Sequence, residues 1–299
     1  MKPGLTVLLL CWNHRAYLAD CIDALAAQTD SDFEIVMVDN VSTDGSAELA
    51  RDLFAKHGLT ARIEVNPAPQ SIPANYNKLA ALANRPLITF LSTDDYYAAE
   101  YVATMRIAAE AHPEADWLSC GGWLLDHPTG ELTEVDLRLF EDRGDIRAAL
   151  LAGLEPFFYV GICYRRAMLA EVGGFDETVL IEDADLFFRL AGRYPHHIVR
   201  VPLLIRRDHG ASASSNPVFM VDALETFYAK HRDSFPGRLL GDRRSDMLRL
   251  YAASHADRGE GAAAVRLSLR ALALRPLDVM KWRTLAYALR TAATSARKA

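Results

Sequence analysis

Two adjacent aspartates, Asp94 and Asp95, follow a short apolar run at 87–91 that is typical of a buried β-strand. Packing does not explain two carboxylates in this place, and in open α/β sheets ligands bind at the carboxyl ends of the strands. Paired carboxylates suit a hard divalent cation together with the phosphates or hydroxyl groups that it carries. The pair therefore predicts a ligand site, although the same aspartates could instead cap a helix expected over 98–111.

Three further polar clusters are placed in the same way, after a predicted strand or at the start of a predicted helix. They are the runs Cys11-Trp12-Asn13-His14, Asp39-Asn40 with Ser42-Thr43-Asp44-Gly45, and Glu182-Asp183 with Asp185. Because the carboxyl ends of parallel strands meet at one edge of a sheet, we expect these clusters to lie together.

Each cluster also has a purely structural explanation. Acidic residues at a helix start complement the helix dipole, which would account for Glu182, Asp183 and Asp185, and Asp39 could be a turn carboxylate. Asp44, inside Ser-Thr-Asp-Gly, fits a turn or a cap better than a ligand contact. We also expect Asp185 to be structural.

The elements that must position these residues alternate between strand and helix patterns over the first 120 residues. This alternation is typical of a parallel sheet with crossover helices. We expect strands at 5–12, 33–38, 62–65 and 87–91, and helices around 18–25, from a Ser42 or Thr43 cap to about His57, and over 73–83. Further strands are expected at 116–125, 157–164 and 199–205, with a helix over 183–194.

From Pro217 onward the pattern is helical, so we divide the chain into domains 1–215 and 216–299. The tail resembles a tetratricopeptide repeat in the spacing of certain residues, although a plain bundle of alanine-rich helices explains it equally well. These residues are Gly259, Ala264, Ala271, Pro276, Trp282 and Leu285. The basic residues of the last helix are expected either to be solvated or to touch an anionic membrane. They are Lys281, Arg283, Arg290, Arg297 and Lys298.

Bulk composition is that of a soluble globular protein of 299 residues, and its net charge of −6 gives no sign of a nucleic-acid surface. The cysteines, Cys11, Cys21, Cys120 and Cys163, show no metal or disulfide spacing, so we expect reduced, core-filling thiols. No apolar run approaches the roughly 20 residues of a membrane span. We therefore expect a cytoplasmic protein, with a peripheral contact at the inner face of the membrane left open.

Taken in order, the clusters resemble the motifs of the family-2 glycosyltransferases, which have the GT-A fold. The resemblance covers about residues 4–215 and omits the tail. It rests on Cys11-Trp12-Asn13-His14 with Gln28-Thr29, Val38-Asp39-Asn40 with Ser42-Thr43-Asp44-Gly45-Ser46, Asn77, Asp94-Asp95, Gly173-Gly174-Phe175-Asp176-Glu177 with Glu182-Asp183 and Asp185, and Arg207-Asp208-His209-Gly210-Ala211-Ser212. It implies an α/β fold with a Rossmann-like, mostly parallel sheet flanked by helices and followed by a helical extension.

The resemblance also implies a role for each motif. Asp39 would accept a hydrogen bond from the N3–H of a uracil or thymine base beside Trp12. Cys11, Asn13 and Asn77 would also bind the nucleotide-sugar donor. Asp94 would hold donor hydroxyls, and Asp95 would bind Mn²⁺ or Mg²⁺. His209 would complete the metal site or contact the diphosphate, Asp183 would be the catalytic base, and Glu182 would orient the acceptor.

The reaction implied is an inverting, non-processive transfer of one sugar from a UDP- or dTDP-linked donor to a hydroxyl of a glycan, lipid-linked or protein acceptor. Bacterial surface glycans are the usual destination. Ser92 stands where relatives often carry another aspartate, and Tyr76 stands where they often carry arginine. No Gln-x-x-Arg-Trp motif follows Asp183, which argues against a processive synthase.

Rival functions are tested by features of the same chain. A non-catalytic nucleotide-sugar-binding scaffold acting through the helical tail is the alternative, and the presence of both Asp95 and Asp183 speaks against it. A sugar nucleotidyltransferase would need a glycine-rich basic loop after the first strand. A dehydrogenase would need Gly-x-Gly-x-x-Gly there, and neither is present.

Overall fold

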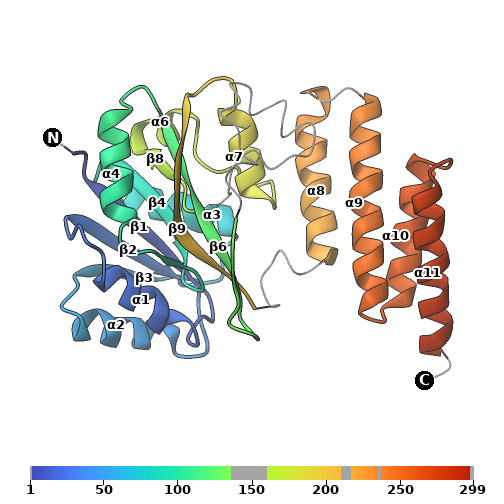
Figure 1. Ribbon diagram of the computed structural model, residues 1–299, viewed down its shortest axis with the longest axis horizontal. Coiled ribbons are helices and arrows are strands. Elements are labelled where there is room, and N and C mark those ends of the chain that lie inside the picture. The colour runs from blue at the N-terminus through green and yellow to red at the C-terminus, as the bar shows by residue number, and fades with distance from the viewer. Residues whose placement is uncertain (1, 136–159, 210–216, 235–236, 297–299) are drawn as a thin grey trace. The chain divides into compact units, whose positions relative to one another are not determined.

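The computed structural model describes residues 2–135, 160–209, 217–234 and 237–296 (Figure 1). The chain separates into two compact units. Unit 1 comprises Met1–Glu177 and Glu182–His209, and unit 2 comprises Thr178–Ile181 and Gly210–Ala299. The predicted boundary between 1–215 and 216–299 stays a prediction, because 210–216 lie outside the described residues.

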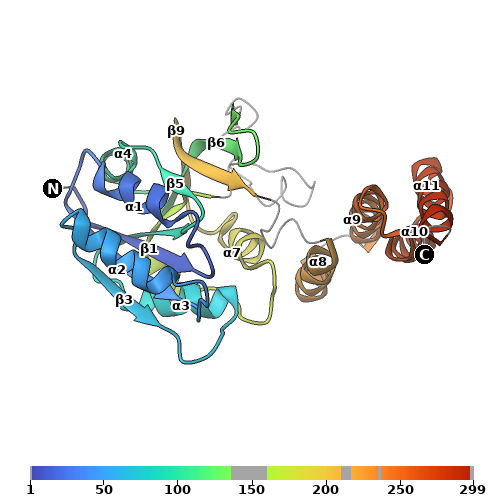
Figure 2. The ribbon, with the colours of Figure 1, turned by 90° about the horizontal axis from the view of Figure 1, so that it is seen from below.

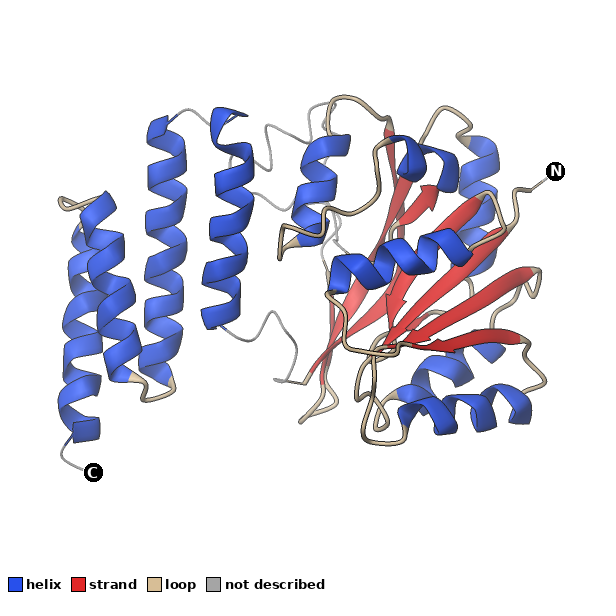
Figure 3. Cartoon of the chain, turned by 180° about the vertical axis from the view of Figure 1, so that it is seen from behind, coloured by secondary structure: helices blue, strands red, loops and turns tan. Residues whose placement is uncertain are grey.

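Unit 1 is built on one mixed sheet with helices on both sides (Figure 3). Its strands are β1 (Leu5–Cys11), β2 (Phe33–Asp39), β3 (Ala61–Val65), β4 (Leu87–Ser92), β5 (Tyr96–Tyr97), β6 (Trp117–Asp126), β7 (Leu132–Glu134), β8 (Cys163–Arg165) and β9 (His196–Asp208). Their order is β3-β2-β1-β4-β8-β6-β9-β5, and β7 pairs with β6. Strands β1 to β4 run parallel, as do β6 and β9, whereas β8 is antiparallel to both neighbours. The predicted mostly parallel α/β fold is confirmed.

The helices of unit 1 are α1 (Leu18–Ala26), α2 (Ser46–Lys56), α3 (Ile72–Leu82), α4 (Tyr101–Ala111), α6 (Arg166–Glu171) and α7 (Glu182–Leu190). Helix α1 buries Leu18, Cys21, Ile22 and Leu25, which lie on one face because their spacing follows the helical period. Helix α3 begins where the Ser71 hydroxyl accepts the Ala74 N–H (3.3 Å), with a proline in its first turn.

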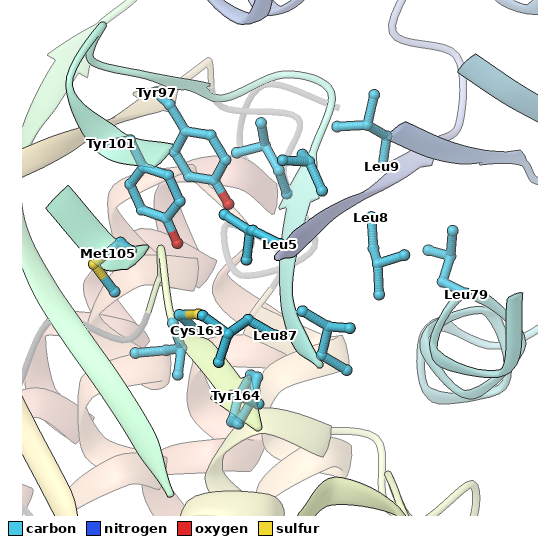
Figure 4. Packing of buried hydrophobic residues seen from close by; sticks show 14 of the residues in the cluster. Leu5, Leu8, Leu9, Leu79, Leu87, Tyr97, Tyr101, Met105, Cys163 and Tyr164 are labelled. Atoms are coloured by element: carbon cyan, nitrogen blue, oxygen red, sulfur yellow. The ribbon is translucent and has the colours of Figure 1, made fainter. Parts of the chain in front are cut away.

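The core of unit 1 lies where β1 and β4 are covered on both faces. All of β1 is buried, as expected for a central parallel strand. Figure 4 shows Tyr97 and Tyr101 with their rings stacked, and the centroids are 3.6 Å apart. Both phenol groups lie 2.7 Å from the buried Thr89 hydroxyl, which also donates to the Ile162 carbonyl (3.0 Å). This satisfied buried network ties β4 to the segment before β8.

Unit 2 is helical. It contains α8 (Pro217–His231), the short 3₁₀ helix η3 (Arg232–Ser234), α9 (Gly237–Asp257), α10 (Gly261–Leu274) and α11 (Val279–Ala296). Figure 2 shows α9, α10 and α11 nearly end-on, and each contacts the other two. Buried alanines, including Ala252, Ala264, Ala271 and Ala288, allow these close contacts. The likeness to a tetratricopeptide repeat stays a prediction. Among the described residues, no helix combines the length and apolar character needed to cross a bilayer.

Several local predictions are corrected by the structure. Helix α2 starts at Ser46, not at a Ser42 or Thr43 cap, because Gly45 takes a left-handed φ of 82° and the Asp44 carboxylate accepts from the Ser46 N–H. Helix α4 starts at Tyr101 and is preceded by β5, so neither Asp94 nor Asp95 caps it. Of the strand expected at 157–164, only Cys163–Arg165 forms within the described part, and 157–159 lie outside it.

Two basic side chains, one on β9 and one on α11, pack against other residues of the fold. His196, in β9, stacks on Trp117 (3.9 Å between centroids) and lies 2.9 Å from the Ser119 hydroxyl, and burial lowers its pKa to about 3. Lys281 is 1% exposed and pairs with Asp246 and Asp278 inside unit 2, so it cannot belong to a membrane-facing basic surface. The four cysteines are free and buried, as predicted.

Candidate active site

The carboxyl ends of β1, β2 and β4 meet at one edge of the sheet. The register pairs Cys11 with Asp39 across β1 and β2, and Leu10 with Ser92 across β1 and β4. The polar clusters that follow these strands are therefore neighbours, as the sequence predicts.

The loops after β1 and β2 are joined by Asn13. Its backbone has a φ of 55°, its N–H donates to the Ser42 hydroxyl (2.8 Å), and its side-chain oxygen accepts the Thr43 N–H (2.8 Å). Asp44 accepts the Arg15 N–H (2.9 Å) in the same junction, which confirms the turn-shaping role predicted for it. Asn13 thus supports the loop, while its predicted contact to a donor stays a prediction.

Asp39 offers one free oxygen beneath this junction. Its Oδ1 accepts the Ser42 N–H (2.8 Å), whereas its Oδ2 is buried without a hydrogen-bond partner in the described part of the chain. A buried carboxylate oxygen without a partner is costly, so it marks a place for a donor group of a ligand. Trp12 lies nearby in sequence with 58% of its surface exposed, as an apolar contact to a base requires. Cys11 is fully buried in β1, and its predicted contact to the donor stays a prediction.

Asp94 lies between two histidines. Its Oδ2 is 3.0 Å from His209 Nε2, and its Oδ1 is 3.8 Å from His14 Nδ1. Burial acts to raise the pKa of Asp94, but His14, the Ser92 hydroxyl and His209 outweigh it and hold that pKa below its usual value. Asp94 Oδ1 and His209 Nδ1 are both buried without a hydrogen-bond partner among the described residues.

Asp95 is held by Arg207. The Arg207 N–H donates to Asp95 Oδ1 (2.8 Å), and its guanidinium donates to the Asp94 carbonyl (2.9 Å) and to Asp20 (2.5 Å). Burial, followed by the charge of Asp94, raises the pKa of Asp95. Arg207 therefore fixes the backbone and one carboxylate of the Asp94-Asp95 pair. The sequence pattern contained Arg207 but gave it no role.

A pocket joins the end of β4 to the start of α7. It is lined by Ser92 and Asp95 on one side and by Glu182 and Asp183 on the other, with an aromatic wall between them. The wall consists of Tyr76, Phe90, Tyr164, Phe175 and Phe187. Burial, followed by the charge of Asp183, raises the pKa of Glu182, which favours the protonated form of this carboxyl group.

The donor set fits a divalent cation only with help from a substrate. No group of three histidine, cysteine or acidic side chains in the described ranges is arranged to hold a metal ion. The free atoms Asp94 Oδ1 and His209 Nδ1, beside Asp95, are nevertheless of the right chemistry. Mg²⁺ typically uses one or two carboxylates, waters and substrate phosphates. The residues therefore fit a cation that arrives with a diphosphate.

Two predicted residues are engaged by the fold. Asp185 is fully buried and bonds to Arg189 (2.8 Å), as its predicted structural role requires. Asn77 uses its amide on the turn before α7: the Phe175 N–H donates to Asn77 Oδ1 (2.8 Å), and Asn77 Nδ2 donates to the Phe175 carbonyl (2.9 Å). Its predicted contact to the donor stays a prediction.

Comparison with known proteins agrees with this arrangement. The family model described as Glycosyl transferase family 2 matches residues 6–122, which carry the Asp39 and Asp94-Asp95 clusters. This segment belongs to glycosyl transferase family 2.

Curated proteins similar to this chain include bacterial glycosyltransferases. The chain is 26% identical over 171 residues to the putative glycosyltransferase EpsH of Bacillus subtilis, covering 56% of this chain and 48% of the relative. It is 30% identical over 115 residues to a PGL/p-HBAD biosynthesis glycosyltransferase of Mycobacterium bovis, covering 38% and 44%. The chain thus spans less than half the length of these relatives.

Solved structures show that the chain has the GT-A fold. S. aureus TarS 1–349 in complex with UDP-GlcNAc is 16% identical with a TM-score of 0.58, covering 96% of this chain and 79% of that one. The mannosyltransferase PcManGT from Pyrobaculum calidifontis, in complex with GDP-Man and Mn²⁺, is 18% identical with a TM-score of 0.62, covering 99% and 87%.

Proposed function

We propose that the chain is an inverting, non-processive glycosyltransferase that moves one sugar from a UDP- or dTDP-sugar to a hydroxyl group of an acceptor. The observation that carries this proposal is the pocket that joins Ser92 and Asp95, at the end of β4, to Glu182 and Asp183, at the start of α7. It brings a diphosphate-compatible edge and a candidate base into one cavity.

The chemistry requires one proton transfer and one displacement. Asp183 takes the proton of the acceptor hydroxyl as its oxygen bonds to the anomeric carbon, and the bond from that carbon to the diphosphate breaks on the opposite face. The electron pair leaves with the nucleoside diphosphate. Neutral Glu182 donates a hydrogen bond that orients the acceptor.

A divalent cation fits beside Asp94, Asp95 and His209. When bound, Mn²⁺ or Mg²⁺ would neutralise the charge that develops on the leaving diphosphate. Arg207 holds Asp94 and Asp95 ready, and His209 orients the second oxygen of Asp94.

The nucleotide is proposed from Asp39. Its free Oδ2 is an acceptor, so it suits a base that presents an N–H, as uracil and thymine do at N3. The UDP-GlcNAc complex of TarS supports a uridine donor, whereas the GDP-Man complex of PcManGT makes guanosine the competing base. The curated relatives, which are bacterial glycosyltransferases, support a glycan as the acceptor.

Thermal-shift measurements with a panel of nucleotide sugars test this function. We expect stabilisation by UDP- or dTDP-sugars that increases with Mn²⁺ and decreases in Asp95→Ala. Stabilisation by GDP-sugars alone would overturn the nucleotide assignment. Stabilisation accompanied by no sugar transfer to any acceptor would favour the non-catalytic scaffold.

A further inference from the structure

The side-chain amide of Asn77 holds the turn between α6 and α7 by hydrogen bonds. Within unit 1, Asn77 pairs with both backbone groups of Phe175, as a neighbouring strand would, and its Nδ2 also donates to Glu177 (3.0 Å). The two participants are 98 residues apart in sequence. This pairing satisfies a backbone N–H and carbonyl that no helix or strand serves.

Glycines allow the turn to approach so closely. Gly173 and Gly174 have φ values of 84° and 69°, and a Cβ built on Gly174 would lie 2.5 Å from Asn77 Oδ1. A side chain at Gly174 would therefore both strain the backbone and push the amide away.

A second side chain, Arg189 of α7, also forms hydrogen bonds to this turn. Arg189 donates to the Val172 carbonyl (3.0 Å) and to the Gly174 carbonyl (2.6 Å), while its Nε donates to the fully buried Asp185 (2.8 Å). The planar guanidinium suits three acceptors at fixed angles, which a lysine cannot reproduce. Helix α7 and the turn are thus locked to each other.

From these contacts we infer that Asn77 and Arg189 are positioning residues. Together they hold the Gly173–Glu177 turn between α3 and α7, and so set both Phe175 in the pocket wall and the first turn of α7, which presents Glu182 and Asp183. Phe175 transmits the position to the wall, since its ring lies 5.1 Å from Tyr76 and 5.2 Å from Phe90. The effect on catalysis that we expect from this positioning rests on the proposed function.

Hydrogen exchange tests the positioning without any assay of activity. In Asn77→Ala we expect the Phe175 amide and the first amides of α7 to exchange at least about tenfold faster. Asn75→Ala is the matched control, because Asn75 lies on the same helix but bonds to Asn66, Gln70 and Ser71. It should leave exchange at Phe175 unchanged. Unchanged exchange in Asn77→Ala would overturn the inference.

Kinetics test the consequence for catalysis. We expect kcat to fall about tenfold in Asn77→Ala and in Arg189→Lys, with the donor KM within about twofold, since the loss of these hydrogen bonds leaves Glu182 and Asp183 less precisely placed. Gly174→Ala should cost a similar factor. The double variant with Asn77→Ala should lose much less than the product of the two, because the steric conflict is removed.

The outcomes separate the two claims. If the wild-type protein transfers no sugar, the proposed function fails while hydrogen exchange still judges the positioning. Faster exchange at Phe175 with an unchanged kcat in Asn77→Ala would overturn the role of these residues in catalysis. A loss in donor affinity, with kcat unchanged, would return Asn77 to the donor-binding role.

Discussion

The free oxygen of Asp39 is the sharpest feature at the residue scale. Oδ1 is used by the Ser42 N–H, and Oδ2 is buried without a partner among the described residues. In Asp39→Asn the amide oxygen can still accept the hydrogen bond from the Ser42 N–H. The amide NH₂ group then faces the N–H of the base, and two hydrogen-bond donors are placed against each other. We expect the Kd for UDP to rise about 10- to 100-fold by calorimetry, equivalent to about 1–3 kcal/mol.

Asp44→Asn is the control for this measurement. Asp44 bonds to the Ser46 and Arg15 N–H groups in the same loop, so its loss should lower the melting temperature but leave UDP affinity within about twofold. An unchanged Kd in Asp39→Asn would remove the base-recognition role.

The protonation of Glu182 predicts how turnover depends on pH. Burial and Asp183 raise its pKa to about 8, so it is protonated below pH 8 and loses its donor hydrogen as the pH rises through that value. We expect the turnover of the wild type to fall between pH 7 and 9. Glu182→Gln, which keeps an N–H donor, should match the wild type at pH 7 within about threefold and lose that fall. A similar alkaline fall in Glu182→Gln would exclude Glu182 as its cause.

At the scale of elements, α10 and α11 approach each other closely at Gly261. A Cβ there would lie 2.3 Å from the Ala292 Cα, so α10 and α11 could not keep their contact. We expect Gly261→Ala to lower the free energy of unfolding of unit 2 by about 2 kcal/mol or more, by urea denaturation.

Gly241→Ala, in α9, is the matched substitution, because a Cβ there meets nothing within 4 Å. Alanine is the better helix former by about 1 kcal/mol, so this variant should be neutral or more stable. Equal effects of the two substitutions would show that the α10–α11 contact is not set by Gly261.

The sequence predicts elements better than it predicts the contacts between them. The apolar runs that became β1, β2 and β4 and the helical spacing of α1 are local patterns, and all were recovered. The full length of β9 was missed because its pairing with β6 is non-local and contains a bulge after Cys120. This pairing brings His196 beside Ser119 and Trp117.

The same limit applies to the site. The prediction that Asp39 and Asp94 lie at one edge of the sheet was correct, because both residues follow parallel strands that run in the same direction. Arg207 donates hydrogen bonds to Asp20 and Asp95, which lie up to 187 positions away in the sequence. No local sequence pattern predicts these contacts. The turn held by Asn77 was recognisable only as a motif, not as a contact.

At the scale of the molecule, unit 2 includes a short excursion of the chain between two parts of unit 1. Thr178–Ile181 belongs to unit 2 and directly precedes Glu182, and within that unit the Leu180 N–H donates to the Thr226 hydroxyl of α8 (3.2 Å). Val179, in the same excursion, is 1% exposed. Within unit 2, this hydrogen bond therefore fixes the segment that directly precedes Glu182 in the sequence.

Thr226→Val keeps the shape of this side chain and removes the acceptor for Leu180. We expect kcat to fall about three- to fivefold, the effect of about 1 kcal/mol, with UDP affinity unchanged. Thr226→Ser keeps the hydroxyl and should retain wild-type turnover. An unchanged kcat in Thr226→Val would show that the link to unit 2 does not influence the site.

Single-turnover sugar transfer by Asp183→Asn, measured beside UDP binding, tests the central claim most directly. Asn cannot take the proton of the acceptor, so transfer should fall roughly 10²- to 10⁴-fold, while the Kd for UDP stays within about twofold of the wild type. The adjacent Glu182→Gln, made and measured in parallel, should retain turnover at pH 7. Wild-type transfer by Asp183→Asn would contradict the assignment of the base and the mechanism built on it.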